Sequence, residues 1–439
     1  MLLAGWYYPD SVGGTEAYVR WLARDLQRRG CDVGVAAPSV DRTEHRYEHD
    51  GIPVYRYPVE PAPGLSEVRG EVPPDHFDVF AKWLDEGRPR LVHMHSLTRG
   101  CGFFHARHAK ALGLPLVMTV HVPGFVCPRG TMMRWGTTPC DGQMRTYRCA
   151  ACSLQAQSVP RAVGWPLSLA SRWAGTWATG RRGRVASALT IGERTAARHA
   201  RVRELFKLAD RVVVVSQWLY SALRRNDVDT RKLALVRHGL PDDYLYASGT
   251  ASTRSARGRL RVGYVGRMHP VKGLRLLVSA LRALPLAMPI ELHIYGTARD
   301  DEEQRYLSAV RATAGEDSRI VFHGELTEPN RLDAFRSFDI LAVPSLWLET
   351  GPLVVLEAFA AGLPVLGSNA GGIAELVTDG VSGRLVEVGS VGAWARALSD
   401  LGEQSKAGRW AWSVPRVRSS RDVAEEMLEI YRRAWEPSC

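Results

Sequence analysis

The segment GYVGRMHPVKG, residues 263–273, places two cations in one loop between an expected strand and an expected helix. The strand ends at Gly266, Arg267 and Lys272 follow, and the helix begins near Gly273. Guanidinium and ammonium groups beside a helix N-terminus suit the binding of a diphosphate. The segment lacks both the P-loop order and the dinucleotide glycine fingerprint, which argues against hydride transfer. The alternative to a diphosphate site is that Arg267 and Lys272 are two solvated cations in a loop.

Two glutamates stand eight positions apart in PSLWLETGPLVVLEAFAAGLPVLGSNAGG, residues 344–372. Glu349 is expected in a loop, and Glu357 just over one turn inside an apolar helix whose first turn suits Pro352. Carboxylates can accept hydrogen bonds from sugar hydroxyls, and the amides of residues 351–353 at the helix start can hold a phosphate. A solvated pair of glutamates is the alternative, but the apolar neighbours of Glu357 argue against it.

Short apolar runs alternate with amphipathic helices from residue 2 to about residue 240, and the rhythm restarts after the polar linker 247–258. This pattern predicts two doubly wound, Rossmann-like α/β domains with parallel sheets, one over 1–246 and one over 259–415. A last helix within 416–439 has an apolar stripe, and packing back on the first domain is one option for it. Such sheets bind ligands at the carboxyl ends of their strands, so we expect the site in a central cleft between the domains.

The 439 residues are 45% hydrophobic and 23% charged, which indicates a globular protein. No apolar run is long enough to span a membrane, and the first residues lack the basic flank of a signal peptide, so we expect a cytoplasmic location. The net charge of +11 points to an acidic partner: nucleic acid, an anionic membrane or a phosphorylated small molecule. A basic surface with no such partner is the alternative.

Four cysteines, Cys127, Cys140, Cys149 and Cys152, form a Cys-rich loop (127–152) shortly after His121. Their C-x2-C end suits a structural zinc site with four thiolates, although the other pair lacks that spacing. An iron–sulfur cluster and free or disulfide-bonded thiols are the alternatives.

The Arg/Trp-rich insertion, residues 153–205, holds nine Arg and two Glu, and therefore carries a charge of +9 − 2 = +7. With Trp165, Trp173 and Trp177 it has the composition of an interfacial membrane segment. A helical insertion whose tryptophans pack on the first domain is the alternative. Either way the segment lies on the expected acceptor side.

The chain resembles, over nearly its whole length, the retaining, nucleotide-sugar-dependent glycosyltransferases of family 4, which have the GT-B fold. The resemblance rests mainly on the Glu349-x7-Glu357 segment with GLP and AGG after it. Support comes from GRMHPVKG, VFHGEL, SVGGTEAYV, ADRVVVVS and VRHGLPDDY.

The resemblance implies a role for each matching residue. Arg267 and Lys272 would neutralise the leaving diphosphate, and Glu357 would accept hydrogen bonds from the donor ribose. Glu349 would contact the transferred sugar. His121, at the end of an expected strand, would contact that sugar beside its anomeric carbon, with a capped loop histidine as the alternative. The donor-binding residues implied are Gly13, Gly14, Gly266, Gly351, Pro352, Leu353 and Glu357.

The predicted reaction is transfer of a sugar from a nucleoside-diphosphate sugar to the hydroxyl of a glycan, lipid-linked or small-molecule acceptor. Cleavage of the glycosyl–phosphate bond builds negative charge on the diphosphate, which fixed cations stabilise, so we expect no catalytic metal and no further cofactor. Retention is implied by the resemblance alone. A nucleotide-sugar epimerase or phosphorylase of the same fold is the alternative. A zinc-ribbon nucleic-acid-binding protein is more remote, because it leaves residues 344–372 unexplained. The donor, the acceptor and the oligomeric state are not specified by the sequence.

Overall fold

The computed structural model describes residues 1–39, 41, 43–68, 70–178, 184–245, 259–406 and 412–435. By its internal contacts the chain forms two compact units: Met1–His238 with Ser420–Cys439, and Gly239–Ser419. The expected linker 247–258 lies outside the described residues. No helix within the described ranges is both long enough and apolar enough to cross a bilayer.

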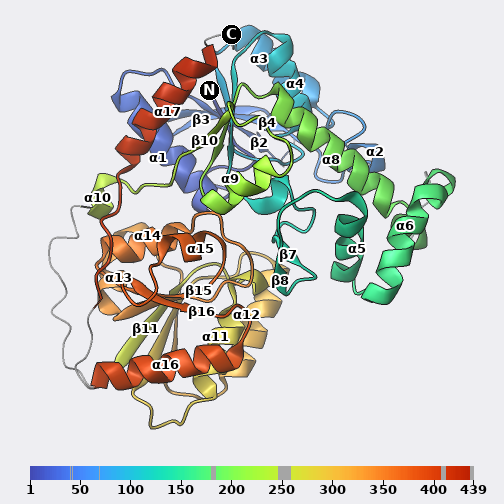
Figure 1. Ribbon diagram of the computed structural model, residues 1–439. Helices are drawn as coiled ribbons and strands as arrows, with labels where there is room; N and C mark the ends of the chain where they lie inside the picture. Colours follow the sequence, from blue (N-terminus) through green and yellow to red (C-terminus); the bar gives the residue numbers. More distant parts are fainter. Residues whose placement is uncertain are drawn as a thin grey trace. The chain divides into compact units, whose positions relative to one another are not determined.

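The first unit is built on an eight-stranded sheet in the order β10-β9-β6-β5-β1-β2-β4-β3 (Figure 1). Its strands are β1 (Leu2–Leu3), β2 (Val35–Ser39), β3 (His45–His49), β4 (Ile52–Pro58), β5 (Val92–Met94), β6 (Leu116–Val120), β9 (Arg211–Val214) and β10 (Leu233–Leu235).

One edge of this sheet corrects the expectation of parallel strands. Strand β3 pairs antiparallel with β4, whereas the other strand pairs are parallel. Asp50 and Gly51 join the two strands with φ of 54° and 74°. Such left-handed turn residues favour a tight hairpin, and the Asp-Gly pair was a signal for it in the sequence.

Helices cover both faces of this sheet, as near-continuous apolar strands require. The helices of this unit are α1 (Gly14–Arg28), α2 (Leu65–Val68), α3 (Phe77–Gly87), α4 (Phe103–Ala111), α5 (Thr146–Ala156), α6 (Arg161–Ala178), α7 (Arg184–Leu189), α8 (Ile191–Leu208), α9 (Gln217–Arg224) and α17 (Ser420–Trp435). Of these, α5, α6 and α7 pack on one another and on α8. Helix α17 lies beside α1 (Figure 1), and its buried Val423 and Met427 share a core with Val19 and Leu22. The Cys-rich loop contains a short antiparallel hairpin of β7 (Met133–Arg134) and β8 (Thr138–Pro139).

The second unit has a six-stranded sheet in the order β13-β12-β11-β14-β15-β16, and its strand pairs are parallel. The strands are β11 (Leu260–Val265), β12 (Ile290–Tyr295), β13 (Ile320–Gly324), β14 (Ile340–Val343), β15 (Val365–Ser368) and β16 (Gly383–Val386). The helices are α10 (Asp242–Leu245), α11 (Leu274–Arg282), α12 (Asp301–Ala314), α13 (Glu328–Ser337), α14 (Leu353–Ala360), α15 (Gly371–Leu376) and α16 (Val391–Lys406). The strand order reverses between β11 and β14, and that switch point is where such sheets bind ligands.

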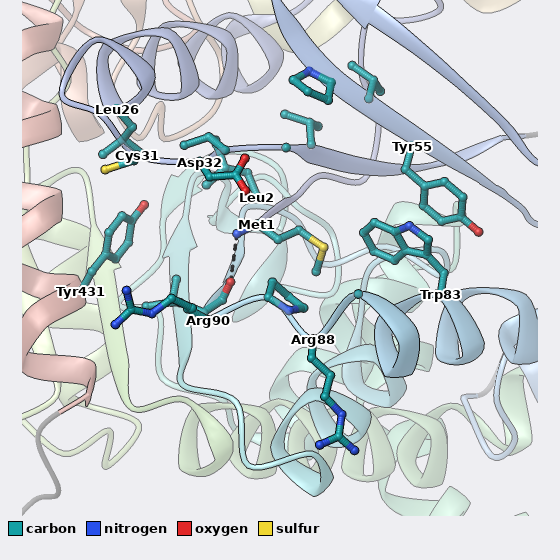
Figure 2. A pocket seen from close by; sticks show the side chains of 18 of the residues that line it. Met1, Leu2, Leu26, Cys31, Asp32, Tyr55, Trp83, Arg88, Arg90 and Tyr431 are labelled. Carbon is teal, nitrogen blue, oxygen red and sulfur yellow. Dashed lines mark hydrogen bonds between the residues drawn. The ribbon is translucent and has the colours of Figure 1, made fainter.

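A cavity of about 840 Å³ opens at the amino ends of the strands of the first unit (Figure 2). The amino group of Met1 donates a hydrogen bond of 2.9 Å to the carbonyl of Leu91 there. None of the residues predicted for the active site lines this cavity. It lies at the sheet edge opposite to the one where parallel strands present ligand-binding loops.

Candidate active site

Two loops of the second unit meet at the switch point between β11 and β14. The N–H of Leu346 donates a 2.7 Å hydrogen bond to the carbonyl of Val271, which ties the loop after β14 to the loop after β11. Gly273 makes this approach possible, because it has a φ of 72° and a Cβ there would lie 1.9 Å from the carbonyl oxygen of Pro344. The neighbouring Lys272, which ends the short 3-10 turn η3 (Pro270–Lys272), is thereby held against the second loop.

The ammonium of Lys272 lies 2.7 Å from Oε1 of Glu349, so the structure brings these two predicted residues together. Glu349 is 6% exposed, and the hydroxyl of Ser345 donates a second hydrogen bond of 2.8 Å to the same oxygen. The backbone is fixed as well, since the N–H of Gly372 donates a 2.6 Å bond to the carbonyl of Glu349. The Lys272 ammonium also lies 5.3 Å from the centre of the Trp347 ring.

Arg267 follows β11 on the same loop and is also paired. Its Nε donates a 2.9 Å hydrogen bond to Glu303, a fully buried residue in the first turn of α12. The Arg267 side chain is itself 56% exposed, so its guanidinium is anchored at one edge and open to solvent at another. Glu303 was not predicted, although the acidic run 300–303 at a helix start was a signal for a charged first turn. Gly266 precedes this loop and donates a 3.1 Å bond to the carbonyl of Tyr295.

Glu357 lies on α14, one turn after Leu353, and is 4% exposed. Both of its carboxylate oxygens accept hydrogen bonds from Arg331 on α13, at 3.0 and 2.7 Å. Each oxygen can still accept a further bond, because a carboxylate offers about four acceptor positions. Arg331 was missed in the sequence because nothing in its spacing links it to Glu357. Gly351 and Pro352 lead into this helix, with Pro352 as its N-cap.

His121 in the first unit directly follows β6 and is buried, at 5% exposed. Its Nε2 lies 3.1 Å from Nδ1 of His95, which directly follows the neighbouring β5, and Tyr18 packs against both rings. Burial, and then the nearby His95, hold the pKa of His121 well below its usual value, so the ring is neutral near pH 7. His95 was not predicted from the sequence, although the His-Met-His run at the end of a strand is a visible signal.

Gly13 caps the N-terminus of α1, and Gly14 is the first residue of that helix. A Cβ on Gly13 would lie 2.7 Å from a carboxylate oxygen of Glu16, whose other oxygen accepts a 2.8 Å bond from the hydroxyl of Ser11. The absent side chain therefore leaves room for Glu16 beside the helix start. Convergence of these residues with those of the second unit in one cleft stays a prediction.

The four cysteines of the Cys-rich loop line one small cavity of about 30 Å³. Among the described residues no group of three or more His, Cys, Asp or Glu is arranged to hold an ion. The sulfur of Cys152 accepts a hydrogen bond of 3.3 Å from the backbone N–H of Trp135. Structural zinc at Cys127, Cys140, Cys149 and Cys152 stays a prediction.

Models of two known protein families together match most of the chain. The sequence model described as "Glycosyl transferase 4-like domain" matches residues 13–239, and the one described as "Glycosyl transferases group 1" matches residues 259–404. The chain is 30% identical over 231 residues to the D-inositol 3-phosphate glycosyltransferase of Salinispora tropica, which is 48% of each chain. It is 32% identical over 231 residues to the enzyme of that name from Stackebrandtia nassauensis, which is 47% of each chain. The chain thus spans about half the length of the curated relatives it matches.

Solved structures show the same fold at low identity. Sucrose-phosphate synthase from Thermosynechococcus elongatus has a TM-score of 0.63 at 20% identity, over 100% of this chain and 99% of the other. The Anabaena protein HepE, solved with UDP and glucose, has a TM-score of 0.60 at 15% identity, over 98% of this chain and 99% of the other. Since the 4-like domain alone matches more than half of the 439 residues, the chain belongs to glycosyltransferase family 4 and has the GT-B fold.

Proposed function

We propose that the protein transfers a sugar from a nucleoside-diphosphate sugar to a hydroxyl acceptor, with retention at the anomeric carbon and without a catalytic metal. The observation that carries this proposal is the Lys272–Glu349 pair at the switch point of the second sheet. A fixed ammonium there is suited to a departing diphosphate, and a neighbouring carboxylate is suited to sugar hydroxyls. The donor class is supported by HepE, a protein of the same fold that was solved with UDP-glucose.

The charged and neutral residues of the site have different roles. Lys272 and Arg267 stabilise the negative charge that grows on the diphosphate as the glycosyl bond breaks. Their carboxylate partners hold them in place beforehand, so little reorganisation is needed during the reaction. Glu357, oriented by Arg331, accepts hydrogen bonds from the ribose. His121 is neutral and can therefore donate or accept a hydrogen bond at the transferred sugar.

The acceptor is part of the same proposal. Relatives carry the name D-inositol 3-phosphate glycosyltransferase, so phosphorylated cyclitols and sugars are the first acceptors to test. Glycans and lipid-linked acceptors follow. We place the reaction in the cytoplasm, at the inner face of the membrane.

Helix α6 supports the membrane contact, because three of its large apolar side chains are exposed, whereas Leu167 packs against Ala150, Leu154 and Ile191. Val163, Trp165 and Leu169 are 53%, 40% and 47% exposed. Arg161 begins the helix, and its guanidinium stacks 5.1 Å from the ring centre of Trp135, which neighbours Trp165. An apolar face that combines tryptophan with arginine is suited to the interface of an anionic bilayer. The side chains of Trp173 and Trp177 lie outside those described.

The side of α6 that packs inside the unit carries small residues. Ser168 and Ser171 are fully buried, and their hydroxyls donate to carbonyls of their own helix at 2.8 and 2.6 Å. Such small residues allow close packing, as at Gly192 of α8, where a Cβ would lie 2.0 Å from the Ser171 hydroxyl.

The test is release of nucleoside diphosphate from a panel of nucleotide sugars, measured with and without acceptor. Lys272→Met should lower kcat by roughly 100-fold or more, since it removes a cation that acts on the leaving group. Arg259→Met, which breaks an exposed ion pair with Glu291, is the matched control and should keep full activity. Full turnover by Lys272→Met would refute the assignment. Release of nucleoside diphosphate without any acceptor would favour an epimerase, and no release from any nucleotide sugar would favour a phosphorylase.

A further inference from the structure

Another cavity in the first unit has a volume of about 490 Å³ and is lined by none of the residues assigned a role so far. It opens at the carboxyl ends of the strands, because Leu97 and Thr98 of the loop after β5 line it. The first turn of α4 and one side of α8 complete the wall. Its lining includes the charged residues Glu67, Arg99, Arg198 and Arg201 and the aromatic residues Phe103, Phe104 and His105.

Arg198 and Arg201 of α8 bring two positive charges to this cavity. Arg198 donates to the carbonyl of Gly124, and Nη1 of Arg201 donates at 3.1 Å to the carbonyl of Gly70. Among the residues that the structure describes, no carboxylate forms an ion pair with either guanidinium. Burial lowers the pKa of both guanidinium groups. Cys127 raises and Arg201 lowers the pKa of Arg198, and Glu71 raises the pKa of Arg201. Half-buried cations that make no direct ion pair are costly, and an anionic ligand reduces that cost.

Two carboxylates lie near these cations: Glu67 in the wall of the cavity, and Glu71, which favours the charge on Arg201. The carboxylate of Glu67 lies 3.1 Å from Nε of Arg99, so these two charges offset each other. Helix α4, nine residues long, begins at Phe103 beside the cavity, and the first N–H groups of a helix have no partner within it. Two guanidinium groups and a helix N-terminus therefore surround the same space.

Gly70 shapes the position of one of the two arginines. It has a φ of 66°, and a Cβ there would lie 3.1 Å from Cζ of Arg201. The glycine therefore lets the guanidinium lie flat against the backbone. The cavity is formed by residues from three separated stretches of the chain.

We propose that this cavity binds a phosphate group carried by the acceptor, an inference that rests on the proposed function. A phosphate monoester has a charge near −2 at neutral pH and three acceptor oxygens, which matches two guanidinium groups better than a single carboxylate does. The position suits an acceptor, since Gly124, which accepts from Arg198, follows His121 by three residues. The rings of Phe103 and Phe104 give the rest of the molecule an apolar wall.

The experiment is hydrogen–deuterium exchange of the full chain, read at peptides over residues 97–105 and 198–205. The probe is glycerol 3-phosphate, with glycerol at the same concentration and matched chloride as controls. The phosphate should protect both peptides in the wild type, whereas glycerol should not. Arg201→Gln should raise the apparent Kd by roughly 30-fold, from the loss of a charge-assisted hydrogen bond. Arg201→Lys, which keeps the charge, should fall between the two.

Two controls make the result specific. Arg194→Gln removes a charge from the exposed side of α8, where Arg194 contacts Ser187, and should leave protection unchanged. Lys272→Met should lose sugar transfer but keep protection, so failure of the donor assignment and failure of this inference are distinguishable. Vesicles of phosphatidic acid in place of glycerol 3-phosphate identify whether the phosphate is lipid-borne or soluble. Absence of protection by both phosphates, or equal protection in Arg201→Gln, would overturn the proposal.

Discussion

The ammonium of Lys272 and the carboxylate of Glu349 stand 77 positions apart in the sequence and 2.7 Å apart in the fold. Lys272 is 28% exposed and Glu349 is buried, so the pair is only partly screened by water. Backbone bonds on both sides hold it: Leu346 to Val271, and Gly372 to Glu349. The cation is consequently positioned before any substrate arrives.

Gly273→Ala should disrupt this pair from the backbone. The left-handed φ of 72° makes an alanine there unfavourable by about 1–2 kcal/mol, and the Cβ would also clash with Pro344. We expect lower stability and a kcat reduced by at least roughly 10-fold, because a displacement of about 1 Å at a reacting site is costly. Denaturant unfolding and transfer rates measure the two effects.

Gly389→Ala is the matched control for that variant. Gly389 has a φ of 76° but no atom within 4 Å of its would-be Cβ, so it carries the backbone strain without the clash. Its activity should stay at the wild-type level. If both variants lost activity equally, close approach at Gly273 would not be the cause.

The free energy of unfolding should decrease as the pH falls from about 7.5 to about 5, a range above the pKa values of most carboxylates. Burial, and then His108, lower the pKa of His105 from 6.5 to about 3, and burial likewise lowers the pKa values of His93 and His95. A histidine with a depressed folded pKa stabilises the fold fully above its unfolded pKa of 6.5, and this contribution is lost as the pH falls below 6.5. At pH 5 the loss from His105 alone is about 2 kcal/mol.

Urea unfolding between pH 7.5 and pH 5 measures this loss, in a range where most carboxylates stay charged. His105→Gln should show a smaller decrease over the same range, because its side chain cannot take up the proton. His45→Gln, at an exposed position on the edge strand, should keep the wild-type slope. Identical slopes for all three proteins would contradict the prediction.

Exposed apolar side chains of α6 should bind the protein to anionic vesicles. Replacement of Val163, Trp165 and Leu169 together by serine should lower the bound fraction by roughly 10-fold or more, since each buried CH2 contributes about 0.8 kcal/mol. Flotation with phosphatidylglycerol vesicles measures it, and added salt should weaken the binding of the wild type.

Leu286→Ser is the control, because Leu286 is 74% exposed in the second unit and should not matter for binding. Equal flotation of the wild type and the triple variant would remove α6 as the contact. Self-association lost in the triple variant, without vesicle binding in the wild type, would point instead to a second copy of the chain.

Local patterns in the sequence determined the alternation of strands and helices, and with it the two α/β units and the strand ends that present Lys272, Glu349 and His121. This works because apolar periodicity and glycine turns are local properties of the chain. The Glu349-x7-Glu357 spacing likewise placed one carboxylate in a loop and the other on a helix.

Only the tertiary structure decided the partners: Glu349 for Lys272, Glu303 for Arg267, Arg331 for Glu357 and His95 for His121. These contacts join residues 26 to 77 positions apart, which a local pattern does not encode. The same holds for α6, where Val163, Trp165 and Leu169 are exposed while Leu167 packs inward, because the helices packed against it decide which side is buried. It holds for the four cysteines too, whose side chains line one cavity, because their spacing in the sequence does not fix how side chains are oriented in space.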